Sequence, residues 1–182
     1  MNSQEGGPVA VGNAILPLTH DLSSLFGEHN RRVLMSAYRI TGNMADAEDV
    51  AQAVFLRLAS TNAPVANAGS YLYRAAINGA LDLLRRRASA AAEPLEEAAS
   101  MASGSSPERT VANRELSDLV REAIAELPPR AAEMFTLRYL EEMDNREIAQ
   151  WFGTSQAVVA VTLHQTRSRL KKRLSELNRG RR

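Results

Sequence analysis

The stretch NREIAQWFGTSQAVVAVTLHQTRSRL, residues 145–170, decides the fold of this chain. Its apolar residues recur at helical spacing on both sides of Gly153, and Thr154 or Ser155 can cap the helix that follows. The stretch therefore predicts a short helix, a tight turn and a long helix, which is the helix-turn-helix pattern. The apolar side chains expected to form the shared core of the two helices are Ile148, Ala149, Phe152, Val159 and Leu163.

The beginning of the second helix carries little charge. In a helix-turn-helix that binds DNA, this end enters the major groove. The side chains expected to face the bases are Ser155, Gln156, Val158 and Thr162. Glutamine can pair with adenine, and the methyl groups of valine and threonine can contact that of thymine. From the residues alone, an ordinary helical hairpin remains the alternative.

The rest of the chain also has the pattern of helices. Helical spacing, caps and breakers predict helices over residues 21–41, 45–60, 70–87, 116–127, 130–140, 145–152 and 155–177. The segment AVVAV, residues 157–161, has the composition of a strand. It lies inside an apolar pattern that continues to Leu177, so we expect it to be helical as well. The predicted fold class is all-α.

Composition divides this all-α chain into two small helical modules, residues 21–87 and 110–177. Residues 88–109 between them are rich in Ala, Ser, Gly and acidic residues, which predicts a flexible linker. We expect a flexible N-terminal arm over residues 1–20 and a basic tail over residues 178–182. The helix-turn-helix belongs to the second module.

The net charge of +1 hides a strong asymmetry. Residues 88–113 carry four acids and one base, whereas residues 128–182 carry eleven bases and six acids. A basic segment of this kind suggests a polyanionic partner for the second module. A solvated helix face followed by a basic tail explains the same charges, so charge alone leaves both interpretations open.

No catalytic or metal-binding pattern stands out in the sequence. The chain has no Cys, its three His residues lack the spacing of a helical metal site, and no phosphate-binding glycine loop is present. Asp46, Glu48 and Asp49 could suggest a metal site, but the helix dipole favours acids at a helix start without any metal. We therefore expect no enzymatic activity, no cofactor and no bound metal.

The sequence also lacks the patterns that direct a chain to a membrane. No apolar run approaches the roughly 20 residues needed to cross a bilayer, and the first 20 residues lack the basic start and apolar core of a secretory signal. The absence of Cys is compatible with a reducing compartment. We expect a soluble cytoplasmic protein without membrane insertion.

Five motifs follow one another along the two modules. They are DAEDVAQAVFLRL (46–58), SYLYRAAINGALDLLRRR (70–87), LPPR (127–130), FTLRYLEEMDNREIAQWFGTS (135–155) and LHQTRSRLKKRL (163–174). Together they resemble the group IV, or extracytoplasmic-function, sigma factors of bacterial RNA polymerase. In that family a promoter-melting module, a linker and a helix-turn-helix module follow one another, in the order expected here.

The resemblance implies roles for individual residues. Those that would contact the clamp helices of the largest polymerase subunit are Asp46, Glu48, Asp49 and Gln52. Those that would hold the unwound −10 strand are Asn62, Asn67, Tyr71, Arg74, Asn78, Arg85, Arg86 and Arg87. Those that would contact the −35 element are Arg130, Thr154, Ser155, Gln156, Val158, Thr162 and Arg167. Structural alternatives are charge compensation at a helix start for the acids, a solvated helix end for the Arg run, and core positions for Tyr71 and Tyr73.

The function implied by the resemblance is promoter-specific transcription initiation. The chain would bind core RNA polymerase through the clamp helices and the flap, recognise promoter DNA and help open it, and an anti-sigma factor would be a further partner. The second helix departs from the family, because Ala160, Thr162 and Gln165 stand at commonly basic positions. The alternative is therefore a sigma-like decoy that binds polymerase or an anti-sigma regulator without productive promoter recognition. An ordinary helix-turn-helix repressor would leave the first two motifs unexplained.

Overall fold

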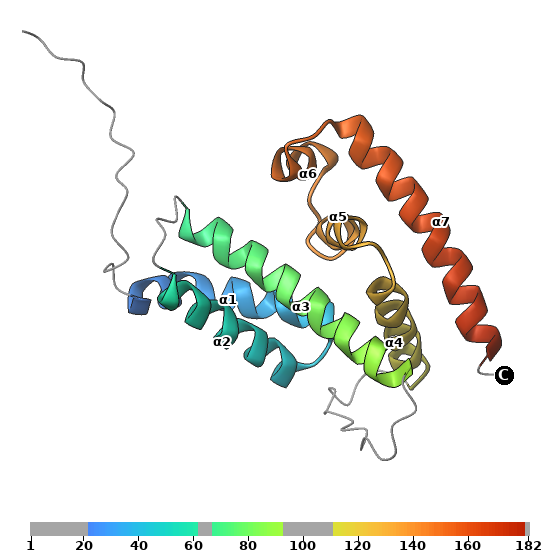
Figure 1. Ribbon diagram of the computed structural model, residues 1–182, viewed down its shortest axis with the longest axis horizontal. Coiled ribbons are helices and arrows are strands. Elements are labelled where there is room, and N and C mark those ends of the chain that lie inside the picture. The colour runs from blue at the N-terminus through green and yellow to red at the C-terminus, as the bar shows by residue number, and fades with distance from the viewer. Residues whose placement is uncertain (1–21, 62–66, 93–110, 181–182) are drawn as a thin grey trace, which may run out of the picture.

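The computed structural model describes residues 22–61, 67–92 and 111–180 of the chain. These residues form helices and no strand, which confirms the all-α prediction for them (Figure 1). The helices are α1 (Leu22–Thr41), α2 (Met44–Ser60), α3 (Ala68–Ala92), α4 (Val111–Ala125), α5 (Pro129–Tyr139), α6 (Asn145–Phe152) and α7 (Gln156–Gly180). The predicted arm, Asn62, most of the predicted linker and the end of the basic tail lie outside the described residues.

The turn between α1 and α2 depends on a glycine and an asparagine. Gly42 has φ 70°, a left-handed conformation that disfavours side chains, and its N–H donates to the carbonyl of Tyr38 at 2.7 Å. Asn43 caps α2, because its side-chain oxygen accepts from the N–H groups of Ala45 (2.9 Å) and Asp46 (3.4 Å). The turn brings α2 back alongside α1 and fixes Asp46 at the first turn of α2.

Helices α1, α2 and α3 pack together as the first module. The largest side chains at its centre are fully buried: Val33, Ile40, Leu58, Leu72, Ile77 and Leu81. Burying a side chain of this kind contributes about 1.5–3 kcal/mol to the free energy of folding. The apolar faces of the three helices therefore stabilise the bundle. Helix α3 continues to Ala92, five residues beyond the predicted end at Arg87.

Helices α4, α5 and α6 all pack on α7 and form the second module. The predicted helix-turn-helix is present within it. Helix α6 begins with a capping box between Asp144 and Glu147, and it ends at Gly153, whose φ is 58°. The predicted shared core is confirmed by the buried side chains of Ile148, Ala149, Val159 and Leu163, with Phe152 half-buried against them.

The two modules also pack against each other. Helix α3 lies beside α4 and α5 (Figure 1), and buried residues of both modules form one continuous apolar cluster. The sequence analysis predicted a linker between the modules and made no prediction about a contact. This contact involves Arg74, one of the predicted DNA-binding residues.

Candidate nucleic-acid interface

A groove of about 630 Å³ lies between α2 and α3. Its walls include the apolar side chains of Val54 and Leu83. The polar and aromatic residues that line it include Arg57, Tyr71, Arg74, Asn78 and Arg86. An apolar wall combined with an aromatic ring, an amide and several cations can hold an unstacked base and its phosphates. Four of the predicted −10 contacts therefore meet in one groove. The sequence analysis did not name Arg57 or Asp82, which also line the groove.

The start of α3 uses Asn67 as its cap. The Asn67 side-chain oxygen accepts from the N–H of Ser70 at 2.8 Å, and its carbonyl accepts from the N–H of Tyr71 at 3.0 Å. Asn67 is exposed, so its side-chain amide nitrogen stays accessible at this end of the helix. Of the two asparagines predicted to contact the −10 strand, only this one lies within the described residues.

Tyr73 lies away from the groove that Tyr71 lines. It is 4% exposed, its ring meets that of Trp151 edge to face at 5.5 Å between centroids, and its hydroxyl donates to Glu141 at 2.8 Å. Burial, and then the bond to Glu141, raises the pKa of Tyr73 well above its ordinary value. The hydroxyl is therefore protonated and acts as a donor, and Tyr73 occupies the core position that the sequence analysis left open.

Arg74 contacts the second module while it lines the groove. Its Nη2 donates to the carbonyl of Trp151 at 3.1 Å and its Nε to Glu133 at 3.4 Å. The guanidinium also lies over the Trp151 ring, 4.9 Å from the centroid. A residue predicted to contact promoter DNA is thus engaged by three groups of the helix-turn-helix module.

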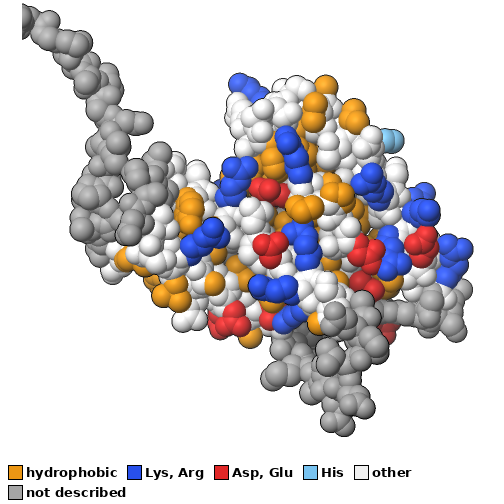
Figure 2. All heavy atoms as spheres, viewed as in Figure 1, with side chains coloured by type: hydrophobic (Ala, Val, Ile, Leu, Met, Phe, Trp, Pro, Cys, Tyr) orange, Lys and Arg blue, Asp and Glu red, His pale blue; other side chains and the backbone are white. Residues whose placement is uncertain are grey.

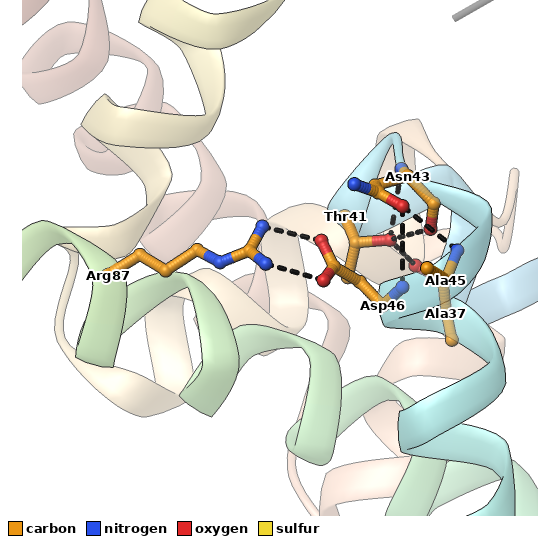
Figure 3. A network of polar contacts seen from close by, with 6 residues as sticks. All are labelled: Ala37, Thr41, Asn43, Ala45, Asp46 and Arg87. Atoms are coloured by element: carbon orange, nitrogen blue, oxygen red, sulfur yellow. Dashed lines mark hydrogen bonds and ion pairs between the residues drawn. The ribbon is translucent and has the colours of Figure 1, made fainter. Parts of the chain in front are cut away.

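The Arg run at the end of the first module does not present three equivalent cations. Arg87 forms a bidentate ion pair with Asp46 that joins α3 to the start of α2 (Figure 3). Asp46 is only 7% exposed. A residue predicted to contact polymerase, Asp46, is thus paired with a residue predicted to contact DNA, Arg87. Arg85 pairs with Asp82 at 2.7 Å. Arg86 is exposed on the wall of the α2–α3 groove.

The other predicted polymerase contacts on α2 divide between two grooves. Glu48 and Gln52 are exposed and line a groove between α1 and α2, together with Phe26 and Leu56, which are 48% and 63% exposed. Asp49 is also exposed, but it lines the α2–α3 groove. Figure 2 shows apolar side chains at the surface over α1 and α2. The sequence analysis missed these apolar members, although Leu56 lies off the buried stripe of its helix.

Helix α7 begins with the predicted cap, because the Ser155 hydroxyl accepts from the N–H of Val158 at 3.3 Å. Gln156 and Val158 are exposed at the first turn. The Thr162 hydroxyl donates to the Val158 carbonyl at 2.8 Å, so it is directed back to the helix. Val161, which the sequence analysis did not name, is 56% exposed. The first turns of α7 therefore present methyl groups and one amide, and no Lys or Arg lies between residues 155 and 166.

Cations lie beside this surface. A hollow next to the beginning of α7 is lined by Gln156 together with Arg138, Arg146 and Arg167. Arg130, at the start of α5, lies over the ring of Phe152 at 5.3 Å from its centroid. Thr154 is half-buried in the turn, and its N–H donates to the carbonyl of Ala149 at 2.9 Å. Arg130 and Arg167 were predicted to contact the −35 element. Arg138 and Arg146 were not, because the only indication in the sequence is that they lie just before and within the helix-turn-helix.

A further apolar groove runs between α4 and α7. The apolar residues that line it are Leu116, Leu119, Val120, Phe135, Leu170 and Leu174. Leu116 is 56% exposed, and Arg167 and Lys171 also line this groove. An exposed apolar groove bordered by charged residues is typical of a surface that receives a partner helix. The sequence analysis did not predict this groove.

Among the described residues, no group of His, Asp and Glu side chains is placed to hold a metal ion. Within the same ranges, no helix combines the length and the apolar character that crossing a bilayer requires.

Comparison with known proteins identifies both modules. The family model "Sigma-70 region 2" matches residues 25–90 and "Sigma-70, region 4" matches residues 117–170. The ECF RNA polymerase sigma factor SigW of Bacillus subtilis is 28% identical over 159 residues, which cover 80% of this chain and 84% of that protein. The ECF RNA polymerase sigma factor SigE of Mycolicibacterium smegmatis is 29% identical over 176 residues, which cover 91% of this chain and 68% of that protein. The crystal structure of Mycobacterium tuberculosis SigJ aligns at 23% identity and a TM-score of 0.44, covering 81% of this chain and 52% of that one.

Proposed function

Because this chain belongs to the extracytoplasmic-function group of the sigma-70 family, we propose that it binds core RNA polymerase and directs it to promoters with −10 and −35 elements. Members of this family are transcription factors rather than enzymes. The observation that supports the proposal is that one chain carries two different surfaces whose residues are suited to contact nucleic acid. The α2–α3 groove lies in the region 2 match, and the helix-turn-helix lies in the region 4 match.

The α2–α3 groove would receive the unwound −10 strand. Tyr71 offers an aromatic face, and stacking of a base on such a face is worth about 1–3 kcal/mol. Asn78 offers an amide for base edges, and Arg57 and Arg86 offer cations for phosphates. Asn67 lies at the end of α3 from which a strand would enter the groove. Arg87 and Asp46 would shape this module rather than contact the strand, because each is held by the other.

The α1–α2 groove would meet the clamp helices of the largest polymerase subunit. Glu48 and Gln52 give it a polar rim that can orient a basic partner. Phe26 and Leu56 give it the exposed apolar area that an interface needs at its centre. The apolar groove between α4 and α7 would receive the polymerase flap. Two separate docking surfaces, one on each module, would place both DNA-binding surfaces along the promoter.

The first turns of α7 would read the −35 element mainly through methyl groups. Val158, Val161 and the methyl group of Thr162 can contact thymine methyl groups, and Gln156 can pair with adenine. Arg138, Arg146 and Arg167 would hold the backbone phosphates on either side. This arrangement favours A·T pairs and DNA shape over the arginine–guanine pairs that many such helices use.

The same cation-poor surface supports a second candidate function. A sigma-like decoy would bind polymerase or an anti-sigma regulator without productive promoter recognition, and it would not need a DNA-reading helix. An anti-sigma factor is a proposed partner under either function.

The experiment mixes the purified full chain with bacterial core RNA polymerase and a genomic promoter library, and then sequences the transcripts. A sigma factor should enrich transcripts whose upstream DNA shares two spaced elements. Polymerase binding without any enrichment would support the decoy. Failure to bind polymerase would contradict the sigma-factor function and a decoy that occupies polymerase. It would favour an independent helix-turn-helix regulator or a decoy that binds only an anti-sigma regulator.

A further inference from the structure

Two contacts fix how α2 and α3 face each other along the groove between them. Asp46, in the first turn of α2, pairs with Arg87 near the end of α3 (Figure 3). Further along α2, Val50 lies against Gly79, because a methyl group added to Gly79 would be 3.3 Å from Val50 Cγ1. The two helices are therefore antiparallel. The start of α2 lies level with the second half of α3, at the end of the groove remote from Tyr71.

The α2–α3 groove carries different charges along its length. Asp49 and Arg86 line the end at the start of α2. Arg57 lies about 12 Å further along α2, at about 1.5 Å per residue, so it lines the end beside Tyr71. Arg74 lines that end as well, one turn after Tyr71. The groove thus has cations at both ends and the carboxylate of Asp49 at one of them.

The three acids in the first two turns of α2 have three different surroundings. Asp46 is held in its ion pair, and Glu48 lines the α1–α2 groove. Asp49 is exposed, lines the α2–α3 groove and forms no ion pair with another described residue. Asp82 also lines this groove, but its carboxylate is paired with Arg85 at 2.7 Å. Asp49 therefore brings an uncompensated negative charge to a groove that is suited to hold nucleic acid.

An unpaired carboxylate is unfavourable beside a phosphate, because like charges repel. Next to Asp49, a bound strand would therefore present a base edge rather than its backbone. A carboxylate only accepts hydrogen bonds, and the base edge that it recognises is the N4 amino group of cytosine. Thymine has the O4 acceptor in the same place, which a carboxylate repels. Arg57 and Arg86 would hold the neighbouring phosphates.

The base beside Asp49 would not be the base that stacks on Tyr71. Asp49 lies level with the part of α3 around Asp82, and α3 rises about 16 Å from Tyr71 to Asp82. Successive phosphates of one strand are about 3.4 Å apart in a duplex, so more than one nucleotide fits between the two positions. The groove therefore has a position at Tyr71 where any base can stack, and a second position at Asp49 where the base edge is tested.

We propose that Asp49 is a specificity-determining contact of the α2–α3 groove, which selects cytosine and rejects thymine at one position of the bound strand. The inference rests on the proposed function, in which this groove receives the unwound −10 strand. It gives Asp49 a role in DNA selection, whereas the family resemblance of its motif implied a polymerase contact. Glu48 and Gln52 keep that polymerase contact on the α1–α2 groove.

The first test compares fluorescein-labelled oligo(dC) and oligo(dT) of equal length by anisotropy, at neutral pH and fixed salt. Both are pyrimidine strands with the same phosphates, so stacking on Tyr71 and contacts with the arginines are common to both. The wild-type chain should bind oligo(dC) about fivefold more tightly, the lower end of the discrimination that one base-edge contact provides. Asp49→Asn should bind oligo(dT) more tightly than the wild type does, and its preference for oligo(dC) should disappear.

Glu28→Gln is the control, because it removes an exposed carboxylate of the same module that lines neither of the module's two grooves. It should keep the preference for oligo(dC). Circular dichroism would confirm that both variants keep their helical content. A wild-type chain that binds the two strands equally would overturn the inference. An Asp49→Asn variant that gains affinity for both strands and keeps the preference would also overturn it, because Asp49 would then be a general repulsive charge.

The second test repeats the transcript sequencing with core polymerase and the promoter library. The wild type should favour cytosine at one position of the −10 element, and Asp49→Asn should lose that preference while the −35 element stays the same. A loss of transcripts from all promoters alike would assign Asp49 to polymerase binding and overturn its role in selection. A wild-type chain that binds neither strand and no polymerase would contradict the proposed function as well. Binding without discrimination between cytosine and thymine would overturn the role of Asp49 alone.

Discussion

At the scale of single residues, Asp46 is the clearest case of a predicted contact residue that is held inside the fold. It is 7% exposed, and its carboxylate accepts hydrogen bonds from both terminal nitrogens of Arg87. We expect Asp46→Asn to lower the free energy of unfolding by about 1–2 kcal/mol, because it weakens charged hydrogen bonds at a half-exposed pair. Urea titration monitored by circular dichroism would measure this loss of stability. Glu48→Gln, an exposed acid on the same helix, should change stability by less than about 0.5 kcal/mol. Equal losses in the two variants would contradict the structural role of Asp46.

The residue scale also marks a limit of sequence reasoning. Tyr71 and Tyr73 are two positions apart, and at about 100° per residue they point to nearly opposite sides of a helix. The sequence thus indicates that one faces the core and the other does not. The spacing of Tyr73, Ile77 and Leu81 places Tyr73 on the buried side of the helix. The hydrogen-bond partner of its hydroxyl could not be predicted, because Glu141 is 68 positions away.

At the scale of elements, α2 contributes to two surfaces, the α1–α2 groove and the α2–α3 groove. The motif of residues 46–58 had suggested a single polymerase-binding surface. Glu48 and Gln52 share the α1–α2 groove, so we expect Glu48→Arg/Gln52→Ala to weaken binding to core polymerase about tenfold, equivalent to about 1.4 kcal/mol. Binding to single-stranded DNA should stay unchanged, because the α2–α3 groove is lined by other residues. Surface-immobilised core polymerase would give the affinities. Glu142→Arg supplies the same charge change on the other module, and a similar loss there would contradict the assignment of the groove.

Helix α7 offers a second test at this scale. Replacing Gln156 and Thr162 with Ala should change which promoters are selected while polymerase binding stays intact. Each lost base contact should alter discrimination at its position by about 1–3 kcal/mol. Sequencing of transcripts from the promoter library would measure this change. Ser168→Ala, an exposed position further along α7, should leave selection unchanged. Unaltered selection in the Gln156/Thr162 variant would assign α7 to a scaffold role.

Most helices could be predicted from local signals. The capping box of Asp144 and the turn glycine Gly153 are sequence patterns, and α6 has the predicted bounds. The end of α3 differs, because its last residues were interpreted by composition as linker. Residues 88–92 are mostly Ala, which has the highest helix propensity, and they extend the helix they follow. Ala-rich segments after a helix are therefore weak evidence for a boundary.

At the scale of the whole molecule, the contact between the modules had no signal in the sequence. The pairs Ser36–Glu141 and Arg39–Glu141 are 105 and 102 positions apart. Single polar side chains at such separation create no periodicity, and either one could equally be a solvated surface residue. The motifs predicted what each module is, whereas the arrangement of the modules depends on three-dimensional complementarity.

The same contact predicts a response of the whole molecule to salt. Arg39 and Arg74 are about half exposed while their carboxylate partners are buried, so dissolved ions can compete for the guanidinium side of each pair. The screening length falls from about 10 Å at 0.1 M salt to about 3 Å at 1 M. We expect the radius of gyration of the free chain, measured by small-angle X-ray scattering, to increase over this range. Glu133→Gln/Glu141→Gln should be expanded at both concentrations, and Glu142→Gln should follow the wild type. A wild-type radius that stays constant would mean that the apolar cluster, and not the ion pairs, holds the modules together.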